Sequence, residues 1–390
     1  MNSLQLILTK LRYFGPSWVF ASLNIIVGTW VLYIPGIKDK LNIDDAQLGI
    51  ALFCFASGTL AMIPLSSILI KKIGVGRVTL FAIITFSILF LVPVIVPNYI
   101  LLCISLFFVG LSACLTDVGM NALVSCIEQE DEVHFMSASH GFFSLGGVIG
   151  AGIGSIIITY IQVPIIHMSY AVIFVIITNL LTARAFFDIT GTGKQKNKEV
   201  KRSYSFKLIK PLFGLTIIAF LIMGSEGAIE HWSKLYLQDV VAVTSEKISG
   251  FGFVTFSAMM TLGRFFGDAI SKRFGSFTII IGGCLISIFG FFAILSSQLV
   301  VTISGFGFVG LGFSVIIPEL FRLAGKAKGI SAAQGISFVA GFGYLGFLLS
   351  PPILGFLSKI ESLRLSFIVL LMAAVIAMII TFFLNRNKRE

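Results

Sequence analysis

Residues 99–127 read YILLCISLFFVGLSACLTDVGMNALVSCI, and Asp117 is the only charged side chain among them. A helix that crosses the hydrocarbon core of a bilayer needs roughly 20 consecutive apolar residues. This stretch exceeds that length, and the chain holds about a dozen such runs separated by short polar breaks. Of its 390 residues, 57% are hydrophobic and only 12% are charged, too few to cover a soluble protein with polar side chains. The composition therefore predicts a membrane protein and excludes a soluble enzyme.

The basic residues are unevenly distributed among the polar breaks. With a cytoplasmic N-terminus, 21 of the 28 Lys and Arg lie in inner loops and tails, six lie in outer loops, and Arg264 lies inside a span. This positive-inside bias predicts that both termini are cytoplasmic. One inner loop, at residues 128–132, is acidic instead of basic. It does not change the predicted orientation, because acidic residues count little in the rule. The net charge of +10 is therefore attributed to membrane orientation, and no nucleic-acid partner is predicted. The predicted spans lie near residues 15–35, 46–70, 76–96, 99–127, 136–160, 163–186, 208–230, 247–270, 276–296, 298–321, 330–357 and 363–384.

Internal repeats divide the chain into two halves. The motif FVGL at residues 108–111 recurs at residues 308–311, 200 positions later. Gly141-Phe142 with Leu145-Gly146 recurs as Gly341-Phe342 with Leu345-Gly346, and the loop KKIG at residues 71–74 recurs as KRFG at residues 272–275. Six spans per half give both halves the same orientation, so they are parallel repeats. We predict an N-terminal six-helix bundle at 1–187, a basic cytoplasmic linker at 188–210 and a C-terminal six-helix bundle at 211–390.

Several further motifs accompany the repeated loop. They are GRFFGD at 263–268, DVGMN at 117–121, SHGF at 139–142, EGA at 226–228 and YLGFL at 344–348. The duplicated loop resembles the signature loop of the major facilitator superfamily, and these motifs resemble its branch of bacterial inner-membrane transporters related to the fucose permeases. The resemblance implies an all-α fold of twelve transmembrane helices, an inner-membrane location, and alternating access around a path enclosed by spans one, four, five, seven, ten and eleven. It also implies a sugar-like or other hydrophilic solute.

The first signature loop departs from the superfamily pattern. Lys71 stands where the family has an acidic residue, and the basic residue after the glycine has moved to Arg77. Arg264 and Asp268, one helical turn apart, are the candidates for the corresponding ion pair in the second half. The predicted gating and signature-loop residues are Lys71, Lys72, Gly74, Arg77, Arg264, Gly267, Asp268, Lys272 and Arg273.

Ionisable groups inside the membrane are the strongest indications of function, because each costs roughly 2.5–3.5 kcal/mol on insertion scales. Asp117 and Asn121 lie four residues apart on one face of span four, and His140 lies near the start of span five. One hypothesis is that Asp117 and His140 form a coupled pair whose proton occupancy changes during transport. The alternative is a structural hydrogen bond that ties span four to span five or to the inner loops.

Glu226 is the leading single site candidate. It lies just past the middle of span seven between Gly224 and Gly227, which let another backbone or a ligand approach closely. It could bind a proton, a cation or a hydroxyl-bearing solute, or it could pair with another helix. Trp232, at the predicted outer end of the same span, is assigned to the interfacial aromatic belt.

Weaker candidates and structural interpretations complete the predicted site. Asn24 and Trp30 in span one and Tyr344 in span eleven are plausible cavity-lining residues. Glu319 and Arg322 are expected to form an ion pair near the inner end of span ten. The glycines between Gly146 and Gly154 suit close helix packing, and because no strand or Walker-type lysine flanks them we reject a phosphate-binding loop.

The sequence predicts a secondary active transporter for a small polar organic solute. Proton-coupled uptake is preferred, because the intramembrane groups are carboxylates and a histidine. Efflux of amphipathic compounds is an alternative within transport, and a non-transporting membrane receptor is an alternative from another class. No catalytic motif, metal-ligand spacing or cofactor motif is present, so no enzyme, metal or cofactor is predicted. We expect a monomer whose partners are the solute, protons and the lipid bilayer.

Overall fold

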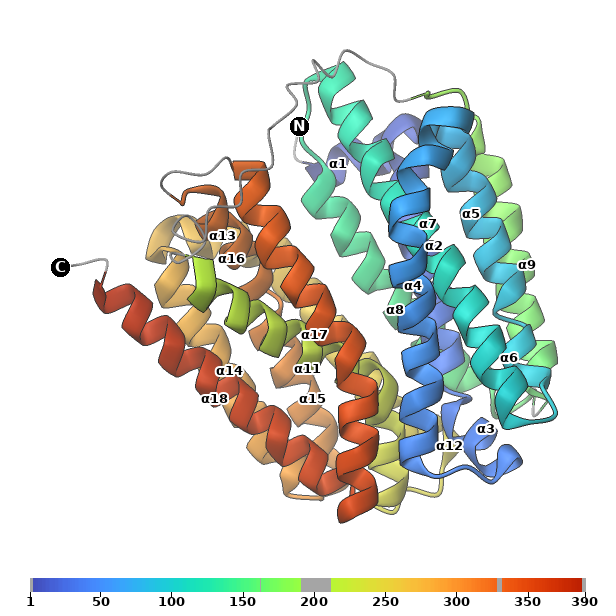
Figure 1. Ribbon diagram of the computed structural model, residues 1–390, viewed down its shortest axis with the longest axis vertical. Coiled ribbons are helices and arrows are strands. Elements are labelled where there is room, and N and C mark those ends of the chain that lie inside the picture. Colours follow the sequence, from blue (N-terminus) through green and yellow to red (C-terminus); the bar gives the residue numbers. More distant parts are fainter. Residues whose placement is uncertain (1–2, 162, 191–211, 328–331, 388–390) are drawn as a thin grey trace. The chain divides into compact units, whose positions relative to one another are not determined.

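The computed structural model describes residues 3–161, 163–190, 212–327 and 332–387 (Figure 1). Every regular element in these ranges is a helix, as the apolar runs predict. Eleven helical segments in these ranges are long and apolar enough to cross a membrane. Helix α13 (Phe251–Phe274) lies at the predicted eighth span, and the side chains of its residues 267–269 and 272 lie outside the described part. With α13, the predicted all-α fold of twelve transmembrane helices is confirmed.

The chain packs as two compact units. The first contains Met1–Lys196 and Ser245–Val254, and the second contains Asn197–Thr244 and Thr255–Glu390. Most of the predicted linker, from residue 191 onward, lies outside the described residues.

The first unit is built from nine helices in the described residues before 191, together with α12 (Glu246–Ser249). In it α2 packs on α8 and α9, α4 packs on α7, and α5 lies between α7 and α9 (Figure 1). Asn98 begins α7 by accepting a hydrogen bond from the Leu101 backbone N–H at 3.0 Å. The helices are α1 (Ser3–Thr9), α2 (Leu11–Val31), α3 (Ile34–Leu41), α4 (Asp45–Ile73), α5 (Val75–Leu89), α6 (Val92–Ile95), α7 (Tyr99–Asp131), α8 (Met136–Ile157) and α9 (Pro164–Ala183).

The second unit repeats this packing. Helix α11 packs on α17 and α18, and α14 packs on α15 and α18 (Figure 1). Its helices are α11 (Phe213–Asp239), α13 from residue 255 onward, α14 (Ser276–Leu295), α15 (Leu299–Phe313), α16 (Ile316–Gly325), α17 (Ala332–Ile360) and α18 (Leu363–Asn387).

Glycines set the closest helix crossings at equivalent places in the two units. A Cβ atom on Gly146 of α8 would lie 2.1 Å from the Ala21 carbonyl oxygen of α2, and one on Gly346 of α17 would lie 2.1 Å from the Phe220 carbonyl oxygen of α11. Only glycine permits backbones to approach this closely. The predicted role of the α8 glycines in close packing is confirmed at Gly146 and at Gly150, which lies against the Ile25 backbone.

The FVGL motifs occupy a second pair of crossings. A Cβ atom on Gly110 of α7 would lie 1.9 Å from the Phe55 carbonyl oxygen of α4, and one on Gly310 of α15 would lie 2.1 Å from the Phe256 carbonyl oxygen of α13. The motifs that repeat in the sequence therefore mark the same structural feature in each unit: the place where two helices are in backbone contact.

Candidate transport site

Asp117 and Asn121 form a local pair on α7. The Asn121 amide Nδ2 donates to the Asp117 carbonyl oxygen at 2.9 Å and to its carboxylate Oδ1 at 3.2 Å. Both side chains are half-buried. Asp117 and Asn121 therefore lie on one face of α7, as predicted, and the neutral Asn121 amide provides a hydrogen-bond donor for the carboxylate.

His140 lies near the start of α8 with an exposed side chain. Its ring meets the Phe20 ring of α2 edge to face, with 5.0 Å between centroids. The proposed coupling of His140 with Asp117 stays a prediction.

Glu226 has a charged partner on a neighbouring helix. The Arg264 guanidinium Nη2 of α13 lies 3.1 Å from the Glu226 carboxylate Oε1 of α11, and each side chain is 18% exposed. Sequence reasoning placed Arg264 in the signature loop and missed this contact. The available signal was that Arg264 is the one basic residue away from the ends of the predicted spans, where an arginine needs an acidic partner.

A second carboxylate accompanies the ion pair. Glu230 follows Glu226 by four residues on α11, so both lie on one face of the helix, and both are half-buried. Two acidic side chains and one guanidinium therefore gather in the membrane-spanning part of the second unit.

The glycines beside Glu226 serve helix packing. A Cβ atom on Gly224 would lie 3.2 Å from the Gly346 carbonyl oxygen, and one on Gly227 would lie 2.8 Å from the Phe347 ring. The sequence predicts that these glycines let either another backbone or a ligand approach, and the structure shows the close approach of α17.

The assignment of Trp232 to the interfacial belt is wrong. Its side chain is fully buried and does not face lipid, and α11 continues seven residues beyond it to Asp239. The predicted pairing of Glu319 with Arg322 is confirmed by a distance of 2.9 Å between carboxylate Oε1 and guanidinium Nη1.

The three weaker candidates differ in environment. Asn24 is buried in the first unit, where its Nδ2 donates to the Phe143 carbonyl oxygen at 3.0 Å and its Oδ1 has no hydrogen-bond partner among the described residues. Trp30 is also buried and packs against the Phe90 ring, with 5.5 Å between centroids. Tyr344 on α17 is half-exposed. Of the three, only Tyr344 presents substantial side-chain surface outside its own unit's core.

The two signature loops turn at glycines with left-handed backbone angles. Gly74 has φ 98° between α4 and α5, and Gly275 has φ 80° between α13 and α14, so the repeated loop has the same conformation twice. Of the remaining loop residues, Lys71 and Lys72 are exposed, and the side chains of Gly267, Asp268 and Lys272 lie outside the described part.

Arginines in both loops lie over aromatic rings. The Arg77 guanidinium lies 5.3 Å from the centroid of Phe187 and 3.7 Å from the carboxylate of Asp188, and that of Arg273 lies 5.3 Å from the centroid of Phe274. The Arg77 and Asp188 side chains are well exposed, so their pairing adds little stability.

The acidic segment at residues 128–132 has a structural use. The Glu128 carboxylate accepts hydrogen bonds from the backbone N–H groups of Phe135 and Met136, at 2.6 and 2.8 Å, where α8 begins. Arg12 of α2 reaches Asp131 at 2.6 Å and Glu130 at 2.8 Å. The acidic residues that depart from the charge bias therefore join the ends of α2, α7 and α8.

Comparison with known proteins agrees with this architecture. The profile of the Major Facilitator Superfamily matches residues 18–333, which is most of the chain. The chain belongs to the major facilitator superfamily. It is accordingly a multi-pass membrane transporter for small-molecule solutes and not an enzyme.

Superfamily relatives align with almost the whole chain. An uncharacterized MFS-type transporter of Yersinia pestis is 28% identical over 364 residues, covering 93% of this chain and 91% of the relative. Membrane protein MosC of Rhizobium meliloti is 27% identical, covering 97% and 91%. A crystal structure of the nucleoside transporter NupG, in a mutant form, superposes with a TM-score of 0.78 at 12% identity, covering 96% of this chain and 100% of that one. That likeness shows the shared fold.

Proposed function

We propose that the protein is a monomeric, proton-coupled secondary transporter that takes up a small polar organic solute across the bacterial inner membrane. Both termini lie in the cytoplasm, and the two halves alternate access to a central path. The observation that carries the proposal is the Glu226–Arg264 ion pair, with Glu230 one turn away on the same face of α11.

The carboxylates of this cluster suit proton coupling. Arg264 pairs with the Glu226 carboxylate, and Lys234, buried four residues after Glu230 on α11, adds a second basic group in a medium where an uncompensated charge is costly. A carboxylate of this cluster can exchange a basic partner for a proton, so that ion pairing and protonation alternate at one place. A hydroxyl or amino group of the solute binds to the same carboxylates, so proton and solute occupancy are linked through one site.

Asp117 and His140 in the first unit form a second candidate coupling position. Asp117 already accepts a hydrogen bond from the neutral Asn121 amide, which stabilises the carboxylate without fixing its protonation. We propose that this position tunes the pH dependence of transport and that the cluster on α11 provides the obligatory proton site.

Reconstituted protein gives a direct test. A thermal-shift screen of metabolites identifies a solute, and proteoliposome uptake is then measured with and without a pH gradient. We expect uptake to follow the gradient in the wild type, and Glu226→Gln and Glu230→Gln each to reduce gradient-driven uptake at least tenfold. Glu361→Gln, at an exposed carboxylate in the turn between α17 and α18, is the matched control and leaves uptake unchanged. Wild-type uptake that ignores the gradient contradicts proton coupling.

Efflux of amphipathic compounds is the second candidate function. It is supported by similarity to the quinolone resistance protein NorA of Staphylococcus aureus, which is 22% identical over 354 residues and covers 87% of both chains. Transport in right-side-out and inverted vesicles separates the two directions. Accumulation of a fluorescent amphipathic dye in inverted vesicles, with no uptake of polar solutes in right-side-out vesicles, replaces the uptake proposal with efflux.

A further inference from the structure

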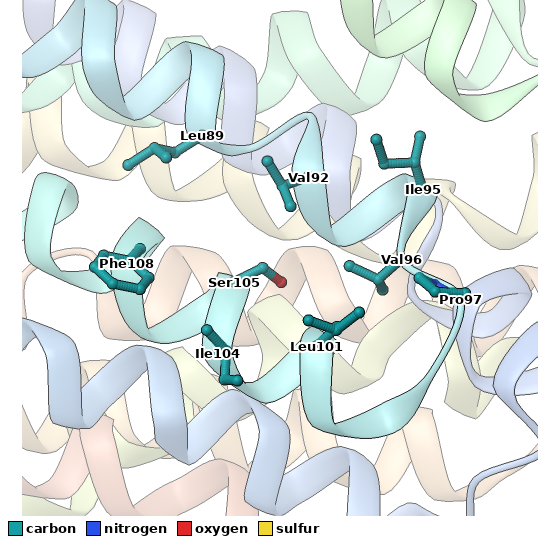
Figure 2. A pocket seen from close by; sticks show the side chains of 9 residues that line it. All are labelled: Leu89, Val92, Ile95, Val96, Pro97, Leu101, Ile104, Ser105 and Phe108. Carbon is teal, nitrogen blue, oxygen red and sulfur yellow. The ribbon is translucent and has the colours of Figure 1, made fainter.

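Two neighbouring apolar cavities, together called the groove, lie on the first unit. The first, of about 350 Å³, lies between the end of α5, α6 and the first half of α7. Figure 2 shows Leu89, Val92 and Ile95 on one side of it and Leu101, Ile104 and Phe108 on the other. The second, of about 310 Å³, lies between α4, α5 and α7, and Leu89 and Phe108 line both cavities.

The second cavity has the length of one lipid tail. Its lining on α5 runs from Val78 to Leu89, about 16 Å at 1.5 Å per residue. Half of the hydrocarbon core is about 15 Å. The rim side chains Phe81 and Phe108 are about half exposed, so the groove opens away from the core of the unit.

An apolar groove does not by itself select an occupant in a membrane, because lipid tails are as apolar as leucine. Selection requires a polar contact at one end of the groove. Lys72 and Arg77 provide it. Lys72 lies three residues after the lining residue Leu69 on α4, and Arg77 lies four residues before the lining residue Phe81 on α5. Each basic residue therefore lies one helical turn beyond the lining, on the same face of its helix.

The charges at this end of the groove are largely uncompensated. Lys71 and Lys72 are exposed and have no ion-pair partner among the described residues. Within the described ranges the Arg77 guanidinium has one ion-pair contact, the loose one with Asp188. It also lies over the Phe187 ring, which contacts the groove residue Phe81 edge to face. The aromatic contacts hold the guanidinium at the mouth of the groove.

We propose that this groove is a binding site for an anionic phospholipid. One acyl chain lies along α5 between Val78 and Leu89, and the phosphate lies between Lys72 and Arg77. Basic residues at the cytoplasmic ends of membrane helices attract the anionic lipids of that leaflet, and the charge bias of the sequence predicts the same side for this loop. The lipid ties the loop around Gly74 to the ends of α4 and α5.

Native mass spectrometry of the purified protein tests the site. Phosphatidylglycerol and phosphatidylcholine with identical acyl chains are added at equal concentration, and the bound lipids are counted. We expect retention of phosphatidylglycerol at least tenfold above that of phosphatidylcholine. Lys72→Gln/Arg77→Gln lowers retention of phosphatidylglycerol about fivefold for each charge removed. Lys388→Gln/Arg389→Gln, the same charge change at the C-terminus, leaves retention unchanged.

A second pair of variants tests the groove itself. Thr85 lines the second cavity with an exposed side chain, so Thr85→Trp fills the groove without entering the core and lowers retention of both lipids. Thr85→Met is the smaller substitution if the tryptophan variant does not fold. Ile177→Trp on α9, where the side chain is 50% exposed, is the matched control and retains lipid like the wild type.

Four outcomes overturn the proposal. The first is equal retention of the two lipids by the wild type, and the second is unchanged retention in the Thr85 variants. The third is full displacement of phosphatidylglycerol by about a hundredfold excess of inorganic phosphate. Because phosphate lacks an acyl chain, this displacement would identify a simple anion site. A dimer mass in place of bound lipid assigns the groove to a second copy of the chain instead.

Discussion

The two halves of the transporter share their helix crossings but not their charges. Gly146 and Gly346 bring α8 and α17 into backbone contact with α2 and α11 in the same way. Among the described residues of the first unit the ion pairs lie at helix ends, where Arg12 meets Glu130 and Asp131 and Lys38 meets Asp45. In the second, the Glu226–Arg264 pair lies inside the helix packing. The repeat preserves the sites of backbone contact, whereas the placement of ionisable groups is specific to each half.

The shared crossings identify which residues correspond. Ala21 of α2 and Phe220 of α11 lie against the two equivalent glycines. The residue numbers of equivalent positions on α2 and α11 therefore differ by 199. Val27 and Val31 then correspond to Glu226 and Glu230, and both valines are buried. The acidic face of α11 has only aliphatic counterparts in the first half, so the proposed proton site belongs to one half alone.

The largest expected effect tests the shared feature. Gly346→Ala places a Cβ atom against the Phe220 carbonyl oxygen, so α11 and α17 must separate. We expect a loss of about 3 kcal/mol or more in stability, seen as a lower melting temperature and reduced monodisperse yield. Gly146→Ala should be equally damaging, because the overlap with Ala21 is the same.

Gly341→Ala is the control on the same helix. Nothing lies within 4 Å of the Cβ position at Gly341, so this substitution should be neutral, or stabilising by up to about 1 kcal/mol through reduced backbone entropy. Equal melting temperatures for Gly341→Ala and Gly346→Ala contradict the importance of the crossing.

The next effect tests the feature that differs between the halves. Arg264→Gln and Glu226→Gln each remove the ion pair between the Arg264 guanidinium and the Glu226 carboxylate. Each should cost about 2 kcal/mol, less than for a fully buried pair because both side chains retain 18% exposure. The double variant should recover part of that loss, which a double-mutant cycle of melting temperatures measures. Strictly additive losses indicate that the two residues stabilise the protein independently.

The sequence predicted the fold because the bilayer imposes a simple rule on it. Every span must be apolar and helical, so residues 99–127 could be identified from composition alone. The repeat was visible because crossing glycines tolerate no substitution by larger residues. Trp232 was misplaced because the predicted span ended near residue 230, whereas α11 extends to Asp239.

The Glu226–Arg264 contact could not be read from spacing. The residues are 38 positions apart on different helices, and a helical period relates only residues of one helix. The contact of Asp117 with Asn121 was predictable for the opposite reason, since both lie four residues apart on α7. Sequence reasoning therefore found the candidate acids but not the partner that sets their charge balance.

A moderate effect is expected at the repeated signature loop. Gly74→Ala and Gly275→Ala each force an alanine into a left-handed backbone conformation, at φ 98° and φ 80°. We expect each to cost about 1–3 kcal/mol. The two losses should be similar, because a Cβ atom meets nothing within 4 Å at Gly275 and only ordinary contacts at Gly74. Chemical denaturation of the two variants side by side measures the difference, and an effect at only one glycine shows that the loops are not equivalent.

The smallest effect concerns the charges at the helix ends of the first half. Arg12→Gln removes contacts with Asp131 and Glu130, but the Arg12 side chain is 39% exposed, and solvent screens the pair. The expected loss is about 1 kcal/mol, and it should shrink in high salt because exposed ion pairs are screened. Arg184→Gln, an exposed arginine without an ion-pair partner among the described residues, removes the same charge and should leave the melting temperature unchanged. Identical losses in the two variants attribute the effect to net charge, whereas a loss confined to Arg12→Gln assigns it to the contact between α2 and the end of α7.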